Sequence, residues 1–310
     1  MNWSSVFYFF GTDAPLQAFI FTILAVGVYL TYRILDVADL SVEGLFPFAA
    51  IITLLLINSN VDPFSSMLIA VLASAAIGAL NAFLHIYLKV PSLLCGIIIM
   101  IALYSVNVVL SKGNISVNDG QNTIMSYMNM LFKNNIASKM VVSFIIMLLV
   151  LLLVYWFFGT ELGLSLRAAG KNKRMARANG LNTSFYYFLG MIISSSLIGL
   201  AGSLYSQATT HISSEDGKGI VVIGLAIVFL GEVIFGKRSF KLTLVSLFVG
   251  SLIYWLIMDI ISVIPGFDSR YLFAVQALFI TIVVSLPHLK GKFKGKFKQR
   301  KETITNDRAN

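Results

Sequence analysis

Long apolar stretches follow one another along almost the whole chain, separated by short polar segments. A helix needs about 20 apolar residues to cross the hydrocarbon of a bilayer, and its backbone must satisfy its own hydrogen bonds there. The stretches are too long and too uniformly apolar for the alternating pattern of barrel strands. They therefore predict an all-α integral membrane protein with about nine transmembrane helices, at residues 16–35, 44–57, 64–88, 91–110, 139–158, 187–207, 219–235, 241–264 and 271–286.

The second stretch, 44–57, is the shortest of the nine and follows the polar run DVADLSVEG. Its length falls below the usual range of about 17–25 residues for a spanning helix. Irregular backbone is tolerated at membrane depth only where protein or a water-filled cavity surrounds it. We therefore expect a broken or re-entrant helix here.

Composition excludes an ordinary soluble enzyme. The 310 residues are 57% hydrophobic and 12% charged, against about 45–50% and about 25% for soluble domains. The single cysteine, Cys95, excludes a disulfide framework, and the three histidines lie too far apart in sequence to indicate a metal cluster. No nucleophile stands beside a base, so we expect no catalytic residue, metal or cofactor in this chain.

The net charge of +9 is distributed unevenly. With nine spans, 18 of the 23 Lys and Arg residues fall on one face, which the positive-inside rule makes cytoplasmic. The amino terminus is then outside and the carboxyl terminus cytoplasmic. The resulting division is an extracellular segment at 1–15, a transmembrane domain at 16–289 and a basic cytoplasmic tail at 290–310.

One cytoplasmic loop, 159–186, predicts a short helix of its own. Asn172 stands where a helix N-cap belongs, residues 173–179 are mostly helix formers, and Gly180 suits a C-terminal stop. So short a helix is marginal in water, so it needs a surface to pack on. Two interpretations stay open: a helix that inserts into a groove on a soluble partner, or a basic loop at lipid headgroups.

The run GLSLRAAGKNKRMARANGLNTSFYYFLG in this loop resembles the cytoplasmic loop of permease subunits of ABC importers related to the ribose and branched-chain amino acid systems. The residues that recur there are Ala169, Gly170, Asn172, Ala176 and Gly180. Segments 36–50, 90–107 and 217–239 narrow the resemblance to the subgroup described as tryptophan/tyrosine transport permeases. Lys173 departs from the pattern, because the family often has Pro there.

The resemblance implies a permease domain over 16–289 that works as a homodimer in the cytoplasmic membrane. It implies a separate ATPase subunit that holds ATP and magnesium, an extracellular or periplasmic solute-binding lipoprotein, and an aromatic amino acid as cargo. Lipid surrounds the domain, and no nucleic acid is expected. The short helix would be the coupling helix, with the ATPase contact formed by Gly170, Asn172, Met175, Ala176, Arg177 and Gly180.

Residues 231–237, GEVIFGK, match the first seven positions of the phosphate-binding pattern G-x-x-x-x-G-K. Position eight is Arg238, where the pattern needs Ser or Thr for magnesium, and the run continues an apolar stretch rather than following a strand. We interpret it as the end of a membrane helix.

Polar groups inside the apolar stretches are the remaining candidates for function. Arg33, Asp36, Asp39 and Glu43 form either a local ion-pair network or part of a broken helix that lines a solute path. Glu232 and Asp259 lie near span ends and can reach water. Asp39 and Glu43 are candidates for a solute path, with the ion-pair network as the competing interpretation. Helix-to-helix hydrogen bonding competes with a solute-path role for the uncharged candidates, namely Asn81, Ser92, Tyr104, Asn107 and Gln207.

Two other functional classes stay open from sequence. An ion-coupled secondary transporter or channel would need internal repeats and carboxylates near the midplane, and we find no convincing repeat. A membrane scaffold for a signalling partner explains the basic loop but not the interrupted second span.

The polar segment 111–138 fits either a solvated outer loop or a docking surface for an extracellular partner.

Overall fold

The computed structural model describes residues 12–127, 135–236, 239–262, 271–272 and 274–285. The predicted basic tail and nearly all of the predicted extracellular segment lie outside these residues. In the described part of the chain the fold is helical apart from two short strands. The elements are α2 (Asp13–Tyr29), η1 (Leu30–Ile34, a π-helix), α3 (Val42–Asn58), α4 (Pro63–Ile86), α5 (Ser92–Ser111), β1 (Asn114–Ser116), α7 (Asn135–Gly159), α8 (Glu161–Lys171), α9 (Lys173–Ala178), α10 (Thr183–Thr209), β2 (His211–Ser213), α11 (Ile220–Phe235) and α12 (Phe240–Ser262).

Six of the helical segments are long and apolar enough to cross a membrane: α2 with η1, α4, α5, α7, α10 and α12. Three shorter apolar helices, α3, α11 and Ala274–Ser285, fall on the second, seventh and ninth predicted stretches. The structure thus confirms a helical membrane protein. A count of nine spans and the orientation stay predictions.

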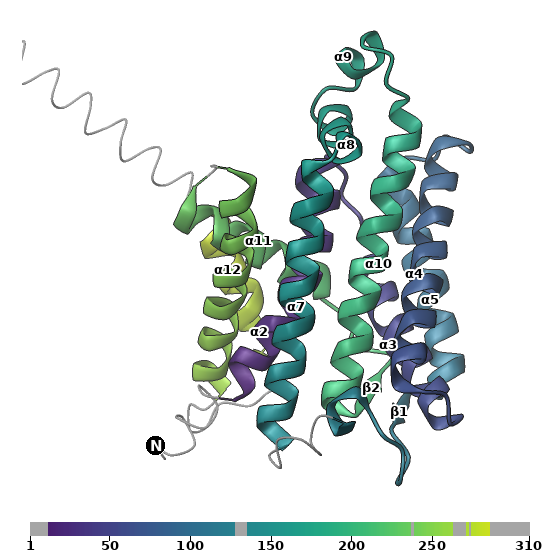
Figure 1. The fold of residues 1–310 in the computed structure, drawn as a ribbon, viewed down its shortest axis with the longest axis vertical. Helices are drawn as coiled ribbons and strands as arrows, with labels where there is room; N and C mark the ends of the chain where they lie inside the picture. Colours follow the sequence, from purple (N-terminus) through teal and green to yellow (C-terminus); the bar gives the residue numbers. More distant parts are fainter. Residues whose placement is uncertain (1–11, 128–134, 237–238, 263–270, 273, 286–310) are drawn as a thin grey trace, which may run out of the picture.

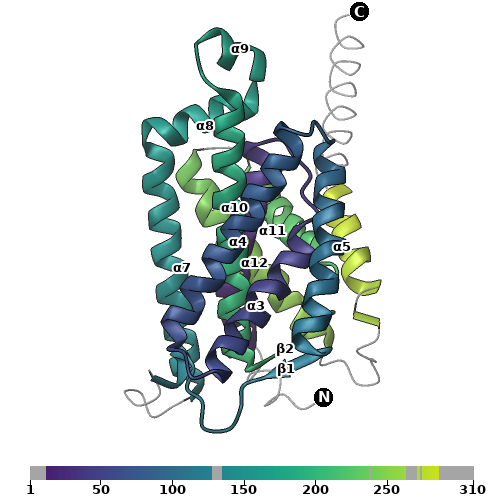
Figure 2. The same ribbon diagram turned by 90° about the vertical axis from the view of Figure 1, so that its right-hand side faces the viewer.

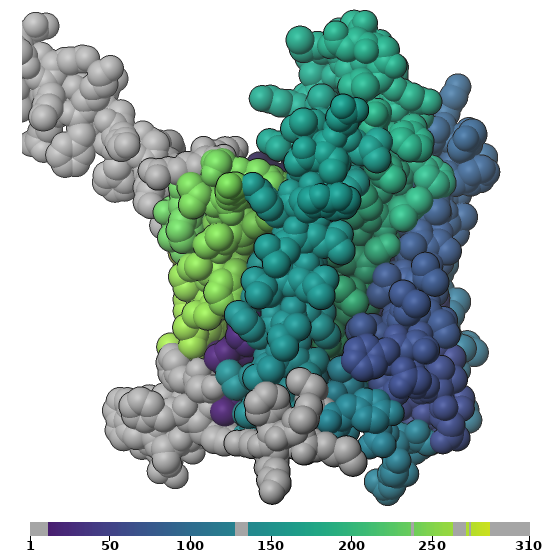
Figure 3. Space-filling model, viewed as in Figure 1, coloured from purple at the N-terminus to yellow at the C-terminus, as the bar shows by residue number. Residues whose placement is uncertain are grey.

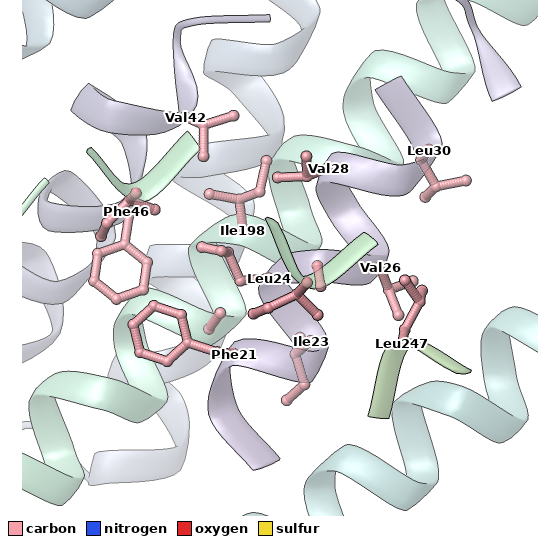
Figure 4. Packing of buried hydrophobic residues seen from close by; sticks show 14 of the residues in the cluster. Phe21, Ile23, Leu24, Val26, Val28, Leu30, Val42, Phe46, Ile198 and Leu247 are labelled. Carbon is pink, nitrogen blue, oxygen red and sulfur yellow. The ribbon is translucent and has the colours of Figure 1, made fainter. Parts of the chain in front are cut away.

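The helices run side by side, with α2 and α10 in the interior (Figures 1 and 2). Helix α2 is buried over most of its length, and α10 packs on α2, α3 and α4. Figure 4 shows the centre of this core, where Phe21 and Leu24 of α2 approach Phe46 of α3 and Ile198 of α10. The apolar residues of these helices therefore form a buried core between helices as well as an apolar outer surface.

The two ends of the bundle differ. At one end β1 pairs antiparallel with β2, with Ile115 opposite Ile212. At the other end α8 lies across the bundle and α9 projects beyond it, as the space-filling view also shows (Figures 2 and 3). Helix α9 matches the short helix predicted in loop 159–186. Helix α8 was not predicted.

Two helix breaks interrupt the bundle. The first break, residues 35–41, follows η1 and turns at Asp36, whose φ is +57°. Helix α3 then begins beside the middle of α5, where a Cβ on Gly44 would lie 2.9 Å from Leu103 Cβ. This start inside the bundle confirms the predicted broken helix.

The second break, residues 214–219, was not predicted. It links β2 to α11 and returns from the strand end into the bundle, where Gly217 packs on the backbone oxygen of Glu43 and on Pro47. The predicted seventh span begins at the observed position, Gly219. There α11 lies against the first turn of α3, and its depth in the membrane stays a prediction.

Candidate functional site

A cavity of about 290 Å³ lies between the first turn of α3, helix α5 and the second break. Its lining comes from α3, from one face of α5 and from the second break, and comprises Glu43, Gly44, Met100, Ile101, Tyr104, Asn107, Ser214, Gly217 and Lys218. Small-molecule sites usually have volumes of about 300–1,000 Å³, so this cavity suits a small solute. It brings together three predicted solute-path residues: Glu43, Tyr104 and Asn107.

Glu43 and Asn107 are held by backbone groups at the breaks. Glu43 Oε1 accepts a hydrogen bond from the Gly219 N–H at 3.2 Å, which ties the first turn of α3 to the start of α11. Asn107 Nδ2 donates to the Gly44 carbonyl oxygen at 2.9 Å. Asn107 is fully buried and its Oδ1 has no partner among the described residues. An unpaired buried acceptor costs free energy, and Asn107 Oδ1 has capacity for a donor that reaches it.

Lys218 adds a positive charge to the same cavity, and the sequence did not single it out. Its ammonium donates to Glu215 at 2.8 Å, and both side chains are exposed. This hydrogen bond raises the pKa of Lys218 above its ordinary value, so the group stays charged at neutral pH. The sequence counted Lys218 among the outer-face basic residues. The polar run before an unusually short seventh helix was the signal that could have found it.

Asp39 and Asn81 lie together at the first break but do not line this cavity. Asp39 Oδ1 accepts from the Ser41 N–H at 2.9 Å and from Asn81 Nδ2 at 3.1 Å. A Cβ on Gly96 would lie 2.8 Å from the Leu40 nitrogen, so α5 passes close to the break. The two side chains shape the break by hydrogen bonding, which is the competing interpretation that the sequence left open.

Ser92 and Gln207 lie apart from the cavity. Ser92 is the first residue of α5 and is half-buried. Gln207 is fully buried in α10, and its Oε1 accepts from the Ile124 N–H at 3.0 Å. Gln207 thus holds the segment before α7 against the bundle.

Arg33 pairs with Glu232 rather than with the acidic residues nearest to it in sequence. The pair joins η1 to α11 at the edge of a second cavity, of about 630 Å³, beneath α8. Among the described residues, Arg33 thus forms no ion pair with Asp36, Asp39 or Glu43, and a solute-path role for this cluster stays a prediction.

The end of the bundle that carries α9 has the predicted local geometry. Asn172 Oδ1 accepts from the Met175 N–H at 3.0 Å, which is an N-cap, and Gly180 has a φ of +78°. Ala176 is buried and Arg177 donates to Thr183 Oγ1 at 2.9 Å, so both contact their own chain, whereas Met175 is 65% exposed. Whether any of these residues contacts an ATPase stays a prediction.

Gly170 lies at the closest approach between α8 and η1. A Cβ there would overlap the carbonyl oxygen of Ile34, so only glycine fits without a shift of backbone.

The run 231–237, which partly matches the phosphate-binding pattern, lies at the end of a helix, as the sequence predicted. Gly231 to Phe235 form the last residues of α11.

Comparisons with known proteins agree with this geometry. A family model described as "Branched-chain amino acid transport system / permease component" matches residues 13–284. A tyrosine transport system permease protein of Clostridioides difficile is 31% identical, over 93% of this chain and 97% of that protein. A nucleoside ABC transporter permease of Lactococcus lactis and a D-allose transport system permease of Escherichia coli are each 24% identical, over 81% and 78% of this chain and 83% and 73% of those proteins.

Among solved structures, PsaBC from Streptococcus pneumoniae in complex with Fab has a TM-score of 0.50 at 17% identity, over 87% of this chain and 89% of that one. This likeness concerns the fold alone. The family model, by contrast, covers nearly the whole described chain. The chain therefore belongs to the family of permease components of branched-chain amino acid transport systems and is a multi-pass protein of the cell membrane.

Proposed function

We propose that this ABC permease is the transmembrane subunit of an importer that moves a small solute, an aromatic amino acid, by alternating access. The observation that carries the proposal is the cavity between the first turn of α3, helix α5 and the second break, with Glu43 and Asn107 in its wall. Transporters commonly build solute sites from interrupted helices, whose free backbone groups line the path. The similarity to a tyrosine permease supports the cargo.

The same proposal assigns the membrane orientation. Nine spans, with the three short helices included, put α8 and α9 on the cytoplasmic side and the β1–β2 pair outside. The uneven distribution of Lys and Arg supports this assignment. The amino terminus is then outside and the chain ends in the cytoplasm.

A homodimer is the third part of the proposal. Lys218 is exposed in one copy, yet it lies beside the middle of α5, together with the exposed side chains of Ile101 and Tyr104. A charged group at that depth is costly in lipid and usually faces the protein interior or water. A second copy facing this surface would enclose the cavity around a shared aqueous path.

A separate ATPase would supply the energy through α9. The exposed Met175 presents an apolar group to a partner, and the close contact of Gly170 with Ile34 links the loop to η1 and so to the first break. ATP binding can shift the permease between its two states only if α9 binds the ATPase differently in each. A solute-binding lipoprotein would deliver the cargo outside.

The test is ATP-driven uptake of tritiated tyrosine by the permease reconstituted with its ATPase and binding protein. Met175→Asp should lower copurification of the ATPase and ATP-driven uptake by at least about tenfold, because buried apolar anchors dominate interface energy. Met175→Leu, which keeps the apolar contact, should resemble the natural protein. Uptake by the lone permease that follows an ion gradient and ignores ATP would overturn the importer in favour of a secondary transporter.

A further inference from the structure

One side of the cavity between α3, α5 and the second break offers hydrogen-bond acceptors. Glu43 uses one carboxylate oxygen to accept from the Gly219 N–H, and a carboxylate accepts several hydrogen bonds, so it retains capacity for a ligand. Asn107 also offers an acceptor. Its amide N–H donates to the Gly44 carbonyl, whereas its buried Oδ1 has no partner among the described residues. An anion and a free acceptor together suit an ammonium group.

The second break supplies the opposite charge. Within the part of the chain that the structure describes, the ammonium of Lys218 is held by an exposed ion pair with Glu215, and such pairs contribute little to stability. Lys218 can therefore exchange that partner for a carboxylate in the cavity at little cost. It stands immediately before α11, whose cap residue Gly219 has no side chain to accept from the first-turn N–H groups. The positive end of that helix also favours an anion.

The third side of the cavity is apolar. Met100 and Ile101 of α5 line it together with the ring of Tyr104. This wall suits the side chain of a hydrophobic or aromatic solute, because ring contacts add to the burial of apolar area. A charged acceptor, a charged donor and an apolar wall thus surround one volume of about 290 Å³.

The solutes named for the relatives differ in charge. Nucleosides and allose are neutral, whereas tyrosine carries both an ammonium and a carboxylate. A neutral solute would offer no opposite charge to Glu43, and none to Lys218 beyond its ion pair with Glu215, and unpaired charges away from water are costly. A zwitterion satisfies both at once.

We propose that this cavity recognises the zwitterionic backbone of an amino acid, with Glu43 and Asn107 on the α-ammonium, Lys218 and the start of α11 on the α-carboxylate, and Tyr104 beside the side chain. The proposal rests on the proposed function, because it assigns the solute site of that importer. It goes further in making two charges, one on the first turn of α3 and one on the second break, the determinants of solute class.

The test is equilibrium binding of tritiated tyrosine to the permease–ATPase complex in nanodiscs without the solute-binding protein, so that only the permease selects. Competitors are tyramine, which lacks the carboxylate, desaminotyrosine, which lacks the ammonium, and uridine, which lacks both charges. The variants are Glu43→Gln and Lys218→Met. Glu215→Gln is the matched control, since it alters the partner of Lys218 but no residue that lines the cavity.

In the natural protein each competitor should bind at least about tenfold more weakly than tyrosine, as expected for the loss of a hydrogen bond to a charged group. Glu43→Gln should weaken tyrosine binding by a similar factor and remove the discrimination against desaminotyrosine. Lys218→Met should do the same for tyramine. Glu215→Gln should leave both properties nearly unchanged.

Uridine binding as strong as tyrosine binding, or tyrosine affinity unchanged in both charge variants, would overturn the zwitterion site. Absence of saturable tyrosine binding to the natural complex would overturn it as well. ATP-driven uptake by the same complex separates this failure from a failure of the importer: uptake that persists leaves the proposed function standing. Competitor profiles of the natural protein decide the matter even if a variant does not fold.

Discussion

Arg33 joins two elements that lie far apart in the sequence. Its guanidinium donates to the Glu232 carboxylate and lies 5.2 Å from the ring centre of Tyr32 and 5.4 Å from that of Phe229. The two side chains are 27% and 18% exposed, so water screens the pair only partly. The pair therefore fixes η1 against α11, next to the cavity beneath α8.

Removing one partner should cost more than removing both. Arg33→Met leaves the Glu232 carboxylate partly buried and unpaired, which we expect to lower stability by about 1–3 kcal/mol, less than for a fully buried pair. The double variant Arg33→Met with Glu232→Gln should recover most of that loss. Thermal unfolding in nanodiscs gives the double-mutant cycle. If the loss of stability in the double variant equals the sum of the losses in Arg33→Met and Glu232→Gln, the pair does not couple η1 to α11.

Polar residues within an apolar stretch are anomalous, and the sequence singled them out as candidates whose role stays a prediction. Glu43, Tyr104 and Asn107 stood out for that reason, and all three line the cavity. The partner of Arg33 could not be found in this way, because Glu232 is 199 positions away and several acidic residues are nearer. Lys218 was missed because the span count placed it in an outer loop.

Helix α8 connects the end that carries α9 to the interior. It buries Gly163, Leu166 and Ala169, spaced three residues apart, and Gly170 packs against the backbone of η1. A π-helix is less regularly bonded than an α-helix and is frequent at functional sites. We therefore expect a displacement of α8 to be transmitted to η1 and to the first break through this contact of backbone with backbone.

Gly170→Ala should disturb this connection specifically. The added Cβ overlaps the Ile34 carbonyl oxygen, so α8 must shift, at a cost of about 1–3 kcal/mol for an overpacked contact. We expect ATP hydrolysis by the complex to continue while ATP-driven uptake falls. Gly159→Ala is the control, because no atom lies within 4 Å of a Cβ at that position. Equal uptake in the two variants would show that the α8–η1 contact does not transmit the motion.

At the level of elements, the sequence predicted the break whose flanking helix is visibly too short. The run at 36–43 is rich in polar residues and the apolar stretch after it is short. These two features together predict a break at 35–41. The second break escaped because residues 214–219 adjoin a strand that pairs with β1, a contact between segments about 100 positions apart. Helix α8 escaped because its apolar positions are few and lie within a basic loop.

On the scale of the whole molecule, the surface around the cavity carries both charged and apolar side chains, and lipid is a poor environment for the charged ones. Lys218 is 57% exposed in its side chain and Ile101 is 59% exposed, and both line the cavity. On α7 the exposed residues between its ends are apolar, as with Leu149 at 58%. Helices α5 and α7 lie on different sides of the bundle (Figure 2). The α5 surface is thus the better candidate for the contact between two copies.

Disulfide cross-linking distinguishes the two surfaces. In a Cys95→Ala background, Ile101→Cys should form a covalent dimer on oxidation in native membranes, because a homodimer closed around the cavity brings two copies of α5 together. Leu149→Cys, equally exposed but on α7, should remain monomeric apart from slow random collisions. Tyrosine should protect Ile101→Cys from cross-linking if the shared cavity holds it. A dimer that forms through Leu149→Cys and not through Ile101→Cys would place the contact on α7 and would overturn a homodimer closed around the cavity.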